Sequence, residues 1–182
     1  MYVPKRLFPA SSSDFETIRE EDMYYVDKTD LAWRIAREHR VAFLSRPRRF
    51  GKSMLLSTLA YYFEGRRDLF DGLRIVPLEE QRGAKAWTKH PVLRFDFSGI
   101  LHVTIEHIEV MMRNVVNAEL YRLGMDELPD DEPLDVQKVG NSLIRKTGQK
   151  LVVLIDEYDS PLLDAMLDGN LPLFDEIRAY LR

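Results

Sequence analysis

A nine-residue loop carries the residues of this sequence that are best suited to bind phosphate. Residues 45–53 read SRPRRFGKS, and the last three match the end of the phosphate-binding pattern G-x-x-x-x-G-K-[ST]. Arg46 stands at the position of the first glycine. Gly51 lets the backbone approach a phosphate closely, Lys52 would contact the β- and γ-phosphates, and the Ser53 hydroxyl would bind Mg²⁺. This spacing predicts a site for a nucleoside triphosphate.

Other features of the same loop extend this prediction. Arg48 and Arg49 add positive charge beside the Gly-Lys-Ser tripeptide. Backbone N–H groups at the start of a helix attract phosphate, and the helix dipole favours negative charge there. The tripeptide can also occur by chance in a polar loop, so the prediction depends on a strand before the loop and a helix after it. The residues expected to bind the nucleotide are Arg48, Arg49, Phe50, Gly51, Lys52, Ser53 and Met54.

Two adjacent carboxylates follow an apolar run late in the chain. Residues 151–155 read LVVLI and lead directly into Asp156 and Glu157. In an open α/β sheet, ligands bind beyond the carboxyl ends of the strands. We therefore expect Asp156 to hold Mg²⁺ or one of its waters, and Glu157 to polarise a water that attacks the γ-phosphate. The alternative is that both acids only form the solvated end of a strand.

The residues after this acidic pair are predicted to begin a helix. Asp159 or Ser160 would serve as the N-cap, with Pro161 at the first helical position. Because capping explains Asp159, the candidate catalytic residues are Lys52 and Glu157, and Asp159 is the next candidate.

Strands and helices that alternate along the chain would position both motifs. The apolar run 41–44 is expected to be a strand buried on both faces, directly before the phosphate loop. Alternation of this kind predicts a parallel α/β sheet. Residues 1–22 are polar and rich in turn formers, so we expect a surface lead-in there and a domain over 23–182. Further strands are expected at 91–97 and 151–155, and helices at 30–38, 52–64, 103–123, 134–146 and 173–181.

The composition excludes several classes of protein. The chain of 182 residues carries 26 Lys and Arg against 30 Asp and Glu, a formal net charge of −4, and this balance does not indicate a nucleic-acid partner. It contains no cysteine, which excludes disulfides, thiolate metal sites and a cysteine nucleophile. No apolar run approaches the length of a membrane span, and we expect a soluble cytoplasmic protein.

Two groups of aromatic residues need an interpretation. Tyr24 and Tyr25 could pack under the sheet or flank an adenine base. Residues 61–63, with the sequence YYF, alternate around the helix after the phosphate loop, and we expect them to pack in the core rather than stack on bases.

With these motifs the sequence resembles the bacterial and archaeal AAA-ATPase-like family, whose members often carry a C-terminal nuclease-like domain of the PD-(D/E)XK type. In that family an arginine in place of the first glycine is normal. The resemblance implies a three-layer αβα P-loop ATPase with an added central strand, ATP and Mg²⁺ as cofactors, and a catalytic Glu after the Walker B Asp. It gives Lys52, Ser53, Asp156 and Glu157 the roles described above. The matching stretches are residues 14–20, 24–29, 46–53, 69–73, 90–98 and 154–159.

The resemblance also sets expectations about what the chain lacks. Family members continue past the helix after Walker B with a strand that bears a sensor residue, further strands and a second domain. This chain stops at Arg182, so we expect residues 23–182 to be the N-terminal part of an ATPase domain, incomplete at its C-terminus and weak or inactive alone. No E-x-K nuclease motif is present, and the nuclease-like domain is expected to be missing from this chain.

The function expected from these motifs is Mg-ATP binding, with ATP hydrolysis in the complete protein. One alternative is a regulatory or interaction module in which bound nucleotide switches contacts with a partner and turnover is slow or absent. A third possibility is a P-loop kinase that acts on a small substrate. The adjacent acids Asp156 and Glu157 favour activation of water instead.

Overall fold

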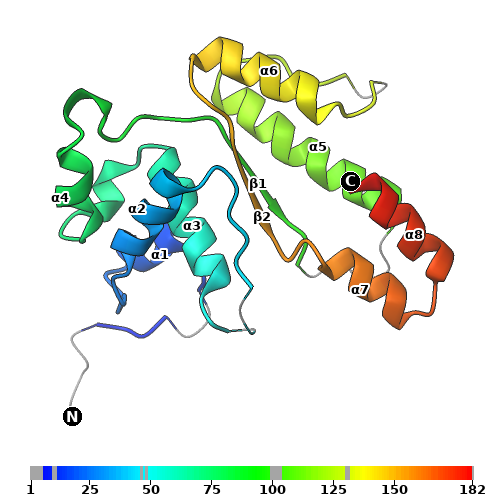
Figure 1. Cartoon of the computed structure of the whole chain (residues 1–182), viewed down its shortest axis with the longest axis horizontal. Coiled ribbons are helices and arrows are strands. Elements are labelled where there is room, and N and C mark those ends of the chain that lie inside the picture. Colours follow the sequence, from blue (N-terminus) through cyan, green and yellow to red (C-terminus); the bar gives the residue numbers. More distant parts are fainter. Residues whose placement is uncertain are drawn as a thin grey trace. The chain divides into compact units, whose positions relative to one another are not determined.

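A computed structural model describes residues 6–9, 12–45, 47, 49–98, 104–129 and 132–181 of the chain. The chain divides into two compact units, Met1–His90 and Pro91–Arg182 (Figure 1). Each unit has its own hydrophobic core. No helix in these described ranges is long and apolar enough to span a membrane.

All regular secondary structure in the described part of the first unit is helical. These helices run from three to twelve residues, and polar or turn-forming residues separate them. The α-helices are α1 (Phe15–Glu20), α2 (Thr29–Glu38), α3 (Lys52–Phe63) and α4 (Ile75–Glu80), and the 3₁₀-helices are η1 (Arg67–Phe70) and η2 (Gly83–Lys85).

Aromatic rings from separate helices form the core of the first unit. Phe15 of α1 packs against Phe70 of η1 with ring centroids 4.8 Å apart, and Tyr62 of α3 packs edge-on against the same ring. Phe15 and Ile18 are both buried. The expectation that residues 1–22 form only a surface lead-in is therefore wrong for α1, because its two large apolar side chains complete a core built by residues far along the chain.

A buried carboxylate joins three elements of this unit. Glu79 of α4 is fully buried, and its Oε2 accepts hydrogen bonds from Trp33 Nε1 of α2 and the Tyr62 hydroxyl of α3, both at 2.8 Å. Its Oε1 accepts from the backbone N–H of Trp87 at 3.0 Å and pairs with Arg82. Because the carboxylate oxygens are satisfied, this charge can be buried without a large penalty.

The second unit is mixed α/β and contains a small parallel sheet. Strands β1 (Val92–Asp96) and β2 (Val152–Asp156) pair in parallel, with Val92 beside Val152 and Asp96 beside Asp156. Parallel strands need a long crossover, and the described part of this one contains two helices. The helices of this unit are α5 (Ile105–Arg122), α6 (Val136–Thr147), α7 (Ser160–Leu167) and α8 (Leu171–Tyr180).

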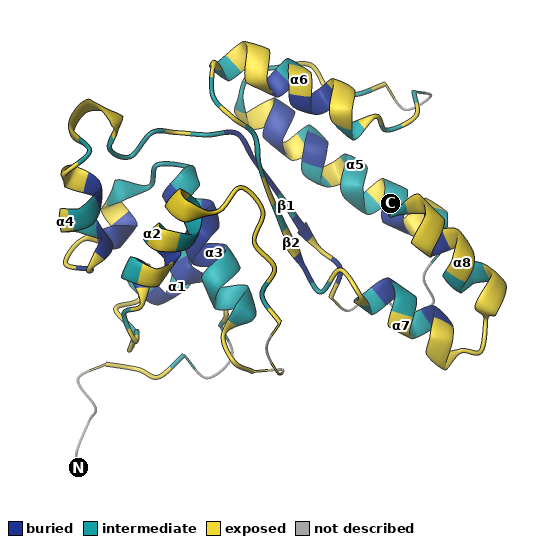
Figure 2. Cartoon of the chain, in the orientation of Figure 1, coloured by how far each residue is buried: buried dark blue, intermediate teal, exposed yellow. Residues whose placement is uncertain are grey.

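The core of the second unit draws on β1 and all four helices. α5 and α6 begin at side-chain caps, because Thr104 Oγ1 accepts from His107 N and Asp135 Oδ1 accepts from Lys138 N. Figure 2 shows the buried face of α5 beside the strands. The buried members of this core are Leu93, Phe95, Phe97, Ile108, Val116, Leu120, Val139, Leu143, Ala165 and Ile177.

Most predicted elements agree with the structure. The strands expected at 91–97 and 151–155 correspond to β1 and β2, and each of the five expected helices is present with small shifts at its ends. The parallel sheet is confirmed as a two-stranded one among the described residues. A three-layer αβα architecture and a single domain over 23–182 stay predictions.

The strand expected directly before the phosphate loop is absent. Residues 41–44 form no strand, and Val41 and Phe43 are 89% and 71% exposed. A strand is stable only with a neighbour that satisfies its backbone groups. The described residues of the first unit contain no other strand that could pair with this run.

Candidate functional site

The phosphate loop leads into α3 through a left-handed turn. Gly51 has φ 76° and is the N-cap residue of α3, and Arg49 also has a positive φ of 66°. An ideal Cβ on Gly51 would meet no atom within 4 Å, so the site needs glycine for its backbone angle rather than for space. Arg46 and Arg48 lie outside the described residues.

The first turn of α3 has backbone donors that point out of the helix. The first intrahelical hydrogen bond runs from Leu55 N to Gly51 O at 3.0 Å, so the N–H groups of Lys52, Ser53 and Met54 have no partner within the helix. No side chain among the described residues caps this turn. Lys52, Ser53 and Met54 are half-buried and Phe50 is exposed. N–H groups without a partner in the helix, at the start of twelve residues of α-helix, suit an anion such as phosphate.

Hydrogen bonds made by Ser57, one turn after Ser53, hold α3 against α1. Ser57 Oγ accepts from the backbone N–H of Phe15 and donates to Asp14 Oδ1, both at 2.9 Å. Burial by itself raises the pKa of the Asp14 carboxyl, but hydrogen bonds from Thr17, Ser57 and Tyr61 outweigh it and place the pKa below the ordinary 3.8. The helix that begins at the phosphate loop is thus fixed to its neighbour by a charged group.

The two tyrosines before α2 have different surroundings. Tyr25 packs against the aromatic core, and burial raises the pKa of its hydroxyl despite a hydrogen bond with Thr58 of α3. Tyr24 is exposed and stacks on Phe8, with ring centroids 4.7 Å apart. Tyr25 is therefore a packing residue, and Tyr62 packs in the core as expected.

The acidic pair lies at the carboxyl end of β2 in the second unit. Asp156 is the last residue of the strand and only 6% exposed, and its Oδ1 accepts from Glu157 N at 3.1 Å. Glu157 has a left-handed φ of 47°, and its carbonyl accepts from Ser160 N at 2.9 Å. A non-glycine residue held at such an angle costs about 1 kcal/mol or more, and such strain is common at functional sites.

The helix that follows begins as predicted, with one difference. Asp159 is at the N-cap position of α7 and Pro161 lies in its first turn, but the Asp159 side chain makes no capping hydrogen bond to the described helix. From the sequence, a capping role was the reason to rank Asp159 below Glu157 as a catalytic residue. The structure does not support that reason.

Asp96 is a further acidic residue at the same sheet end. It is the last residue of β1 and the register partner of Asp156, and Phe97 N donates to Asp156 O at 3.1 Å. Asp96 is exposed, and its Oδ1 accepts from Ser98 N at 2.9 Å. In the sequence, Asp96 lies near the end of the expected strand 91–97, a weaker signal than the five apolar residues that lead into Asp156.

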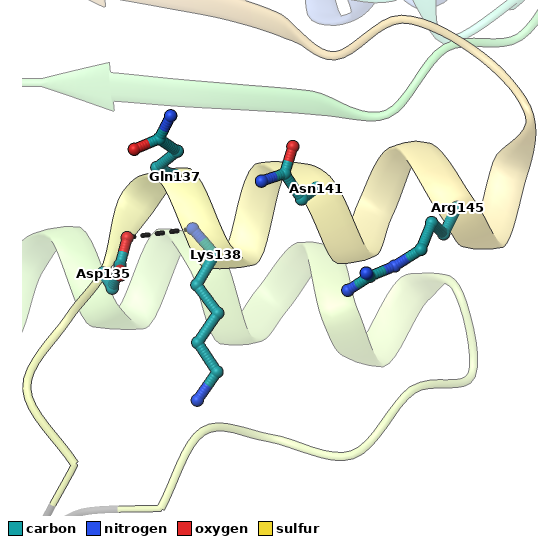
Figure 3. Close-up of a pocket in the computed structure, with 5 residues that line it drawn as sticks. All are labelled: Asp135, Gln137, Lys138, Asn141 and Arg145. Atoms are coloured by element: carbon teal, nitrogen blue, oxygen red, sulfur yellow. Dashed lines mark hydrogen bonds between the residues drawn. The ribbon is translucent and has the colours of Figure 1, made fainter.

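A further candidate site is an open pocket on the surface of the second unit. A polar pocket of about 300 Å³ lies over α6, lined by Asp135, Gln137, Lys138, Asn141 and Arg145 (Figure 3). Each lining residue is exposed and Lys138 is paired with Glu132, so this pocket is part of the solvated surface of α6. Within the described ranges, no group of three or more His, Cys, Asp or Glu residues could hold a metal ion.

Comparison with known protein families identifies the chain. The family model described as "Predicted AAA-ATPase" matches residues 9–182, which is nearly the whole sequence. The chain belongs to the AAA-ATPase-like family. The family resemblance carried by the phosphate loop and the acidic strand end is therefore confirmed.

A curated relative of this AAA-ATPase-like chain comes from Azotobacter chroococcum mcd 1 and is named "Uncharacterized protein in vnfD 5'region". The two are 35% identical over 162 residues, a match that covers 88% of this chain and 30% of the relative. The chain thus spans less than a third of that relative's length. No solved structure matched the chain.

Proposed function

We propose that this chain binds Mg-ATP through residues 48–54 and that the full-length protein hydrolyses ATP to ADP and phosphate. The observation that carries the proposal is the start of α3, where a left-handed glycine precedes Lys52 and a turn that no described side chain caps. Its backbone donors suit phosphate oxygens, and membership of the AAA-ATPase-like family favours a nucleotide as their source. As part of the same proposal, the protein would have a three-layer αβα P-loop fold and would be located in the cytoplasm.

Each proposed residue has one chemical task. Arg48, Arg49, Phe50 and Met54 would line the nucleotide, with the backbone of Gly51 approaching the phosphates. The Lys52 ammonium would stabilise negative charge on the β- and γ-phosphates. Ser53 and Asp156 are oxygen ligands of the kind that Mg²⁺ prefers, and the ion would neutralise phosphate charge when bound. Glu157 would accept a proton from the water that attacks the γ-phosphorus, and ADP would leave.

Binding is tested first with Lys52→Ala and isothermal titration calorimetry with Mg-ATP. A lost charge-assisted contact should cost about 2 to 3 kcal/mol, or roughly 30- to 150-fold in Kd. Lys85→Ala is the matched control, because Lys85 is an exposed lysine of the same unit. Unchanged affinity in Lys52→Ala, or an equal loss in Lys85→Ala, would contradict the phosphate-loop assignment.

Turnover is tested with Glu157→Gln in the full-length protein. Glutamine keeps the shape and hydrogen bonding but cannot take the proton, so phosphate release should fall by roughly two to four orders of magnitude while ATP still binds. Equal turnover in the variant would shift the role to another residue, first Asp159. ATP binding with no phosphate release by the parent protein would favour the nucleotide-dependent interaction module instead.

A further inference from the structure

The helix α7 has both buried and exposed apolar side chains. Leu162 and Ala165 pack into the core of the second unit. Leu163, Met166 and Leu167 are exposed, and their spacing of three and four residues places them on one face of the helix. A surface helix of a globular protein normally has a polar outer face. The outer face of α7 is therefore unusual.

The turn after α7 extends this apolar face to the start of α8. Gly169 N donates to Met166 O and Asn170 N donates to Ala165 O, which closes a tight turn between the helices. Leu167 and Leu171, on either side of the turn, are 86% and 64% exposed. Figure 2 shows the turn and the adjoining ends of both helices as exposed. We call Leu163, Met166, Leu167 and Leu171 the outer face of the hairpin.

The segment of sequence that carries this outer face is acidic. Residues 151–177 contain seven Asp and Glu residues and no Lys, Arg or His, although the whole chain has 26 Lys and Arg. Asp164 and Asp168 belong to or directly follow α7, and Glu176 is exposed on α8. The first cation after this segment is Arg178, which pairs with Asp175. The apolar outer face thus belongs to a stretch of 27 residues, 151–177, whose charged side chains are all acidic.

We propose that the outer face binds a basic amphipathic helix of a partner protein. Leucine and methionine side chains would be buried by the partner's apolar stripe, and methionine adapts its shape to such a contact. The surrounding carboxylates would attract the partner's Lys and Arg residues and speed association. The same charges repel nucleic-acid phosphates and anionic lipid headgroups, so a protein helix suits this surface better. This inference does not depend on nucleotide binding.

The test measures binding of a synthetic helix to the full chain by fluorescence anisotropy. The probe is an amphipathic peptide of Lys and Leu, about 18 residues long, with both ends blocked. A peptide of the same pattern with Glu in place of Lys is the control for charge. The double variant Leu167→Ser/Leu171→Ser removes the centre of the outer face, and both residues are so exposed that folding should be unaffected. Tyr121→Ser changes an exposed aromatic residue of α5 in the same unit and serves as the matched control.

The Lys-Leu peptide should bind at least tenfold more tightly than the Glu-Leu peptide, and its affinity should fall as salt rises from about 50 to 300 mM. The double variant should bind it at least tenfold more weakly, and Tyr121→Ser should match the parent. Equal binding by the parent and the double variant overturns the proposal. Concentration-dependent dimerisation of the parent that the double variant abolishes would also overturn it, because the outer face would then be an interface between copies.

Discussion

Gly51 and Gly72 offer a direct comparison at the scale of single residues. Both have left-handed angles, φ 76° and 77°, and in both an ideal Cβ would meet no atom within 4 Å. Alanine at either position should therefore lower the free energy of unfolding by about 1 kcal/mol through backbone strain alone. Only Gly51→Ala should also weaken ATP binding, because only this residue precedes the proposed phosphate-binding turn. Urea unfolding and calorimetry check the two effects, and an equal loss of ATP affinity in Gly72→Ala would contradict the assignment.

Glu157 should show a conflict between stability and activity. Its left-handed φ of 47° is strained for glutamate, and glycine adopts this angle without that cost. Glu157→Gly should raise the free energy of unfolding by up to about 1 kcal/mol while ATP hydrolysis by the full-length protein is lost. Glu157→Gln keeps the strain and should leave stability unchanged. Thermal unfolding of both variants checks this, and a destabilised glycine variant would show that the angle carries no strain.

The sequence allowed the phosphate loop and the acidic pair to be proposed as site residues, because both are contiguous motifs. Asp96 could not be assigned in this way, since its place beside Asp156 depends on the register of two parallel strands far apart in the chain. The sequence also could not show that the Asp159 side chain makes no capping hydrogen bond to the described helix. Its residue type, Asp before a helix-starting Ser-Pro pair, fits a cap, whereas its side-chain direction depends on the structure.

At the scale of elements, Asp14 should matter more than an ordinary helix cap. It caps α1 through Thr17 N at 3.0 Å and also accepts from Ser57 of α3. Asp14→Ala should lower the free energy of unfolding by about 2 kcal/mol at neutral pH. Asp135→Ala removes the side-chain cap of α6 and should cost only about 1 kcal/mol. Similar losses in both variants would show that the contact with α3 adds nothing.

The effect of Asp14 should depend on pH in one direction. Its native pKa is depressed below the ordinary 3.8, so its carboxylate contributes its full stabilisation above that value. The contribution is lost as pH falls through the depressed native pKa. The difference in stability between the parent and Asp14→Ala should therefore stay constant from neutral pH to about pH 4 and shrink below it. Urea unfolding at a series of pH values measures this, and a difference that persists in acid would contradict it.

The long helices and both strands of the sheet could be predicted from the sequence because their apolar spacing is regular. α5 is an example, with an apolar face that ends near Gly124. For two segments, the burial of side chains could not be predicted, because it depends on neighbours from other parts of the chain. α1 joins the core because Phe15 meets Phe70. Residues 41–44 are apolar enough for a buried strand, but the described residues of Met1–His90 include no second strand to form a sheet with them.

For the whole molecule, two separate cores predict two regions of stability. Leu143 is fully buried in the core of Pro91–Arg182, and Phe70 is fully buried in that of Met1–His90. Leu143→Ala should cost about 2 to 5 kcal/mol, and the cost should appear as faster hydrogen exchange in α5, α6 and β1 rather than in α3. Phe70→Ala should give the reverse pattern. Equal acceleration throughout the chain in either variant would show a single cooperative core.

The position of the two tryptophans has an optical consequence. Trp33 and Trp87 are the only tryptophans of the chain, and both contact Glu79 within Met1–His90. Selectively excited tryptophan fluorescence therefore reports on Met1–His90, the half that contains the phosphate loop. It carries no emission from Pro91–Arg182. Far-ultraviolet circular dichroism sees the helices of both halves. A denaturant titration followed by both signals thus needs no label to distinguish the halves, and a nucleotide that shifts the emission midpoint first would be acting on the tryptophan-containing half.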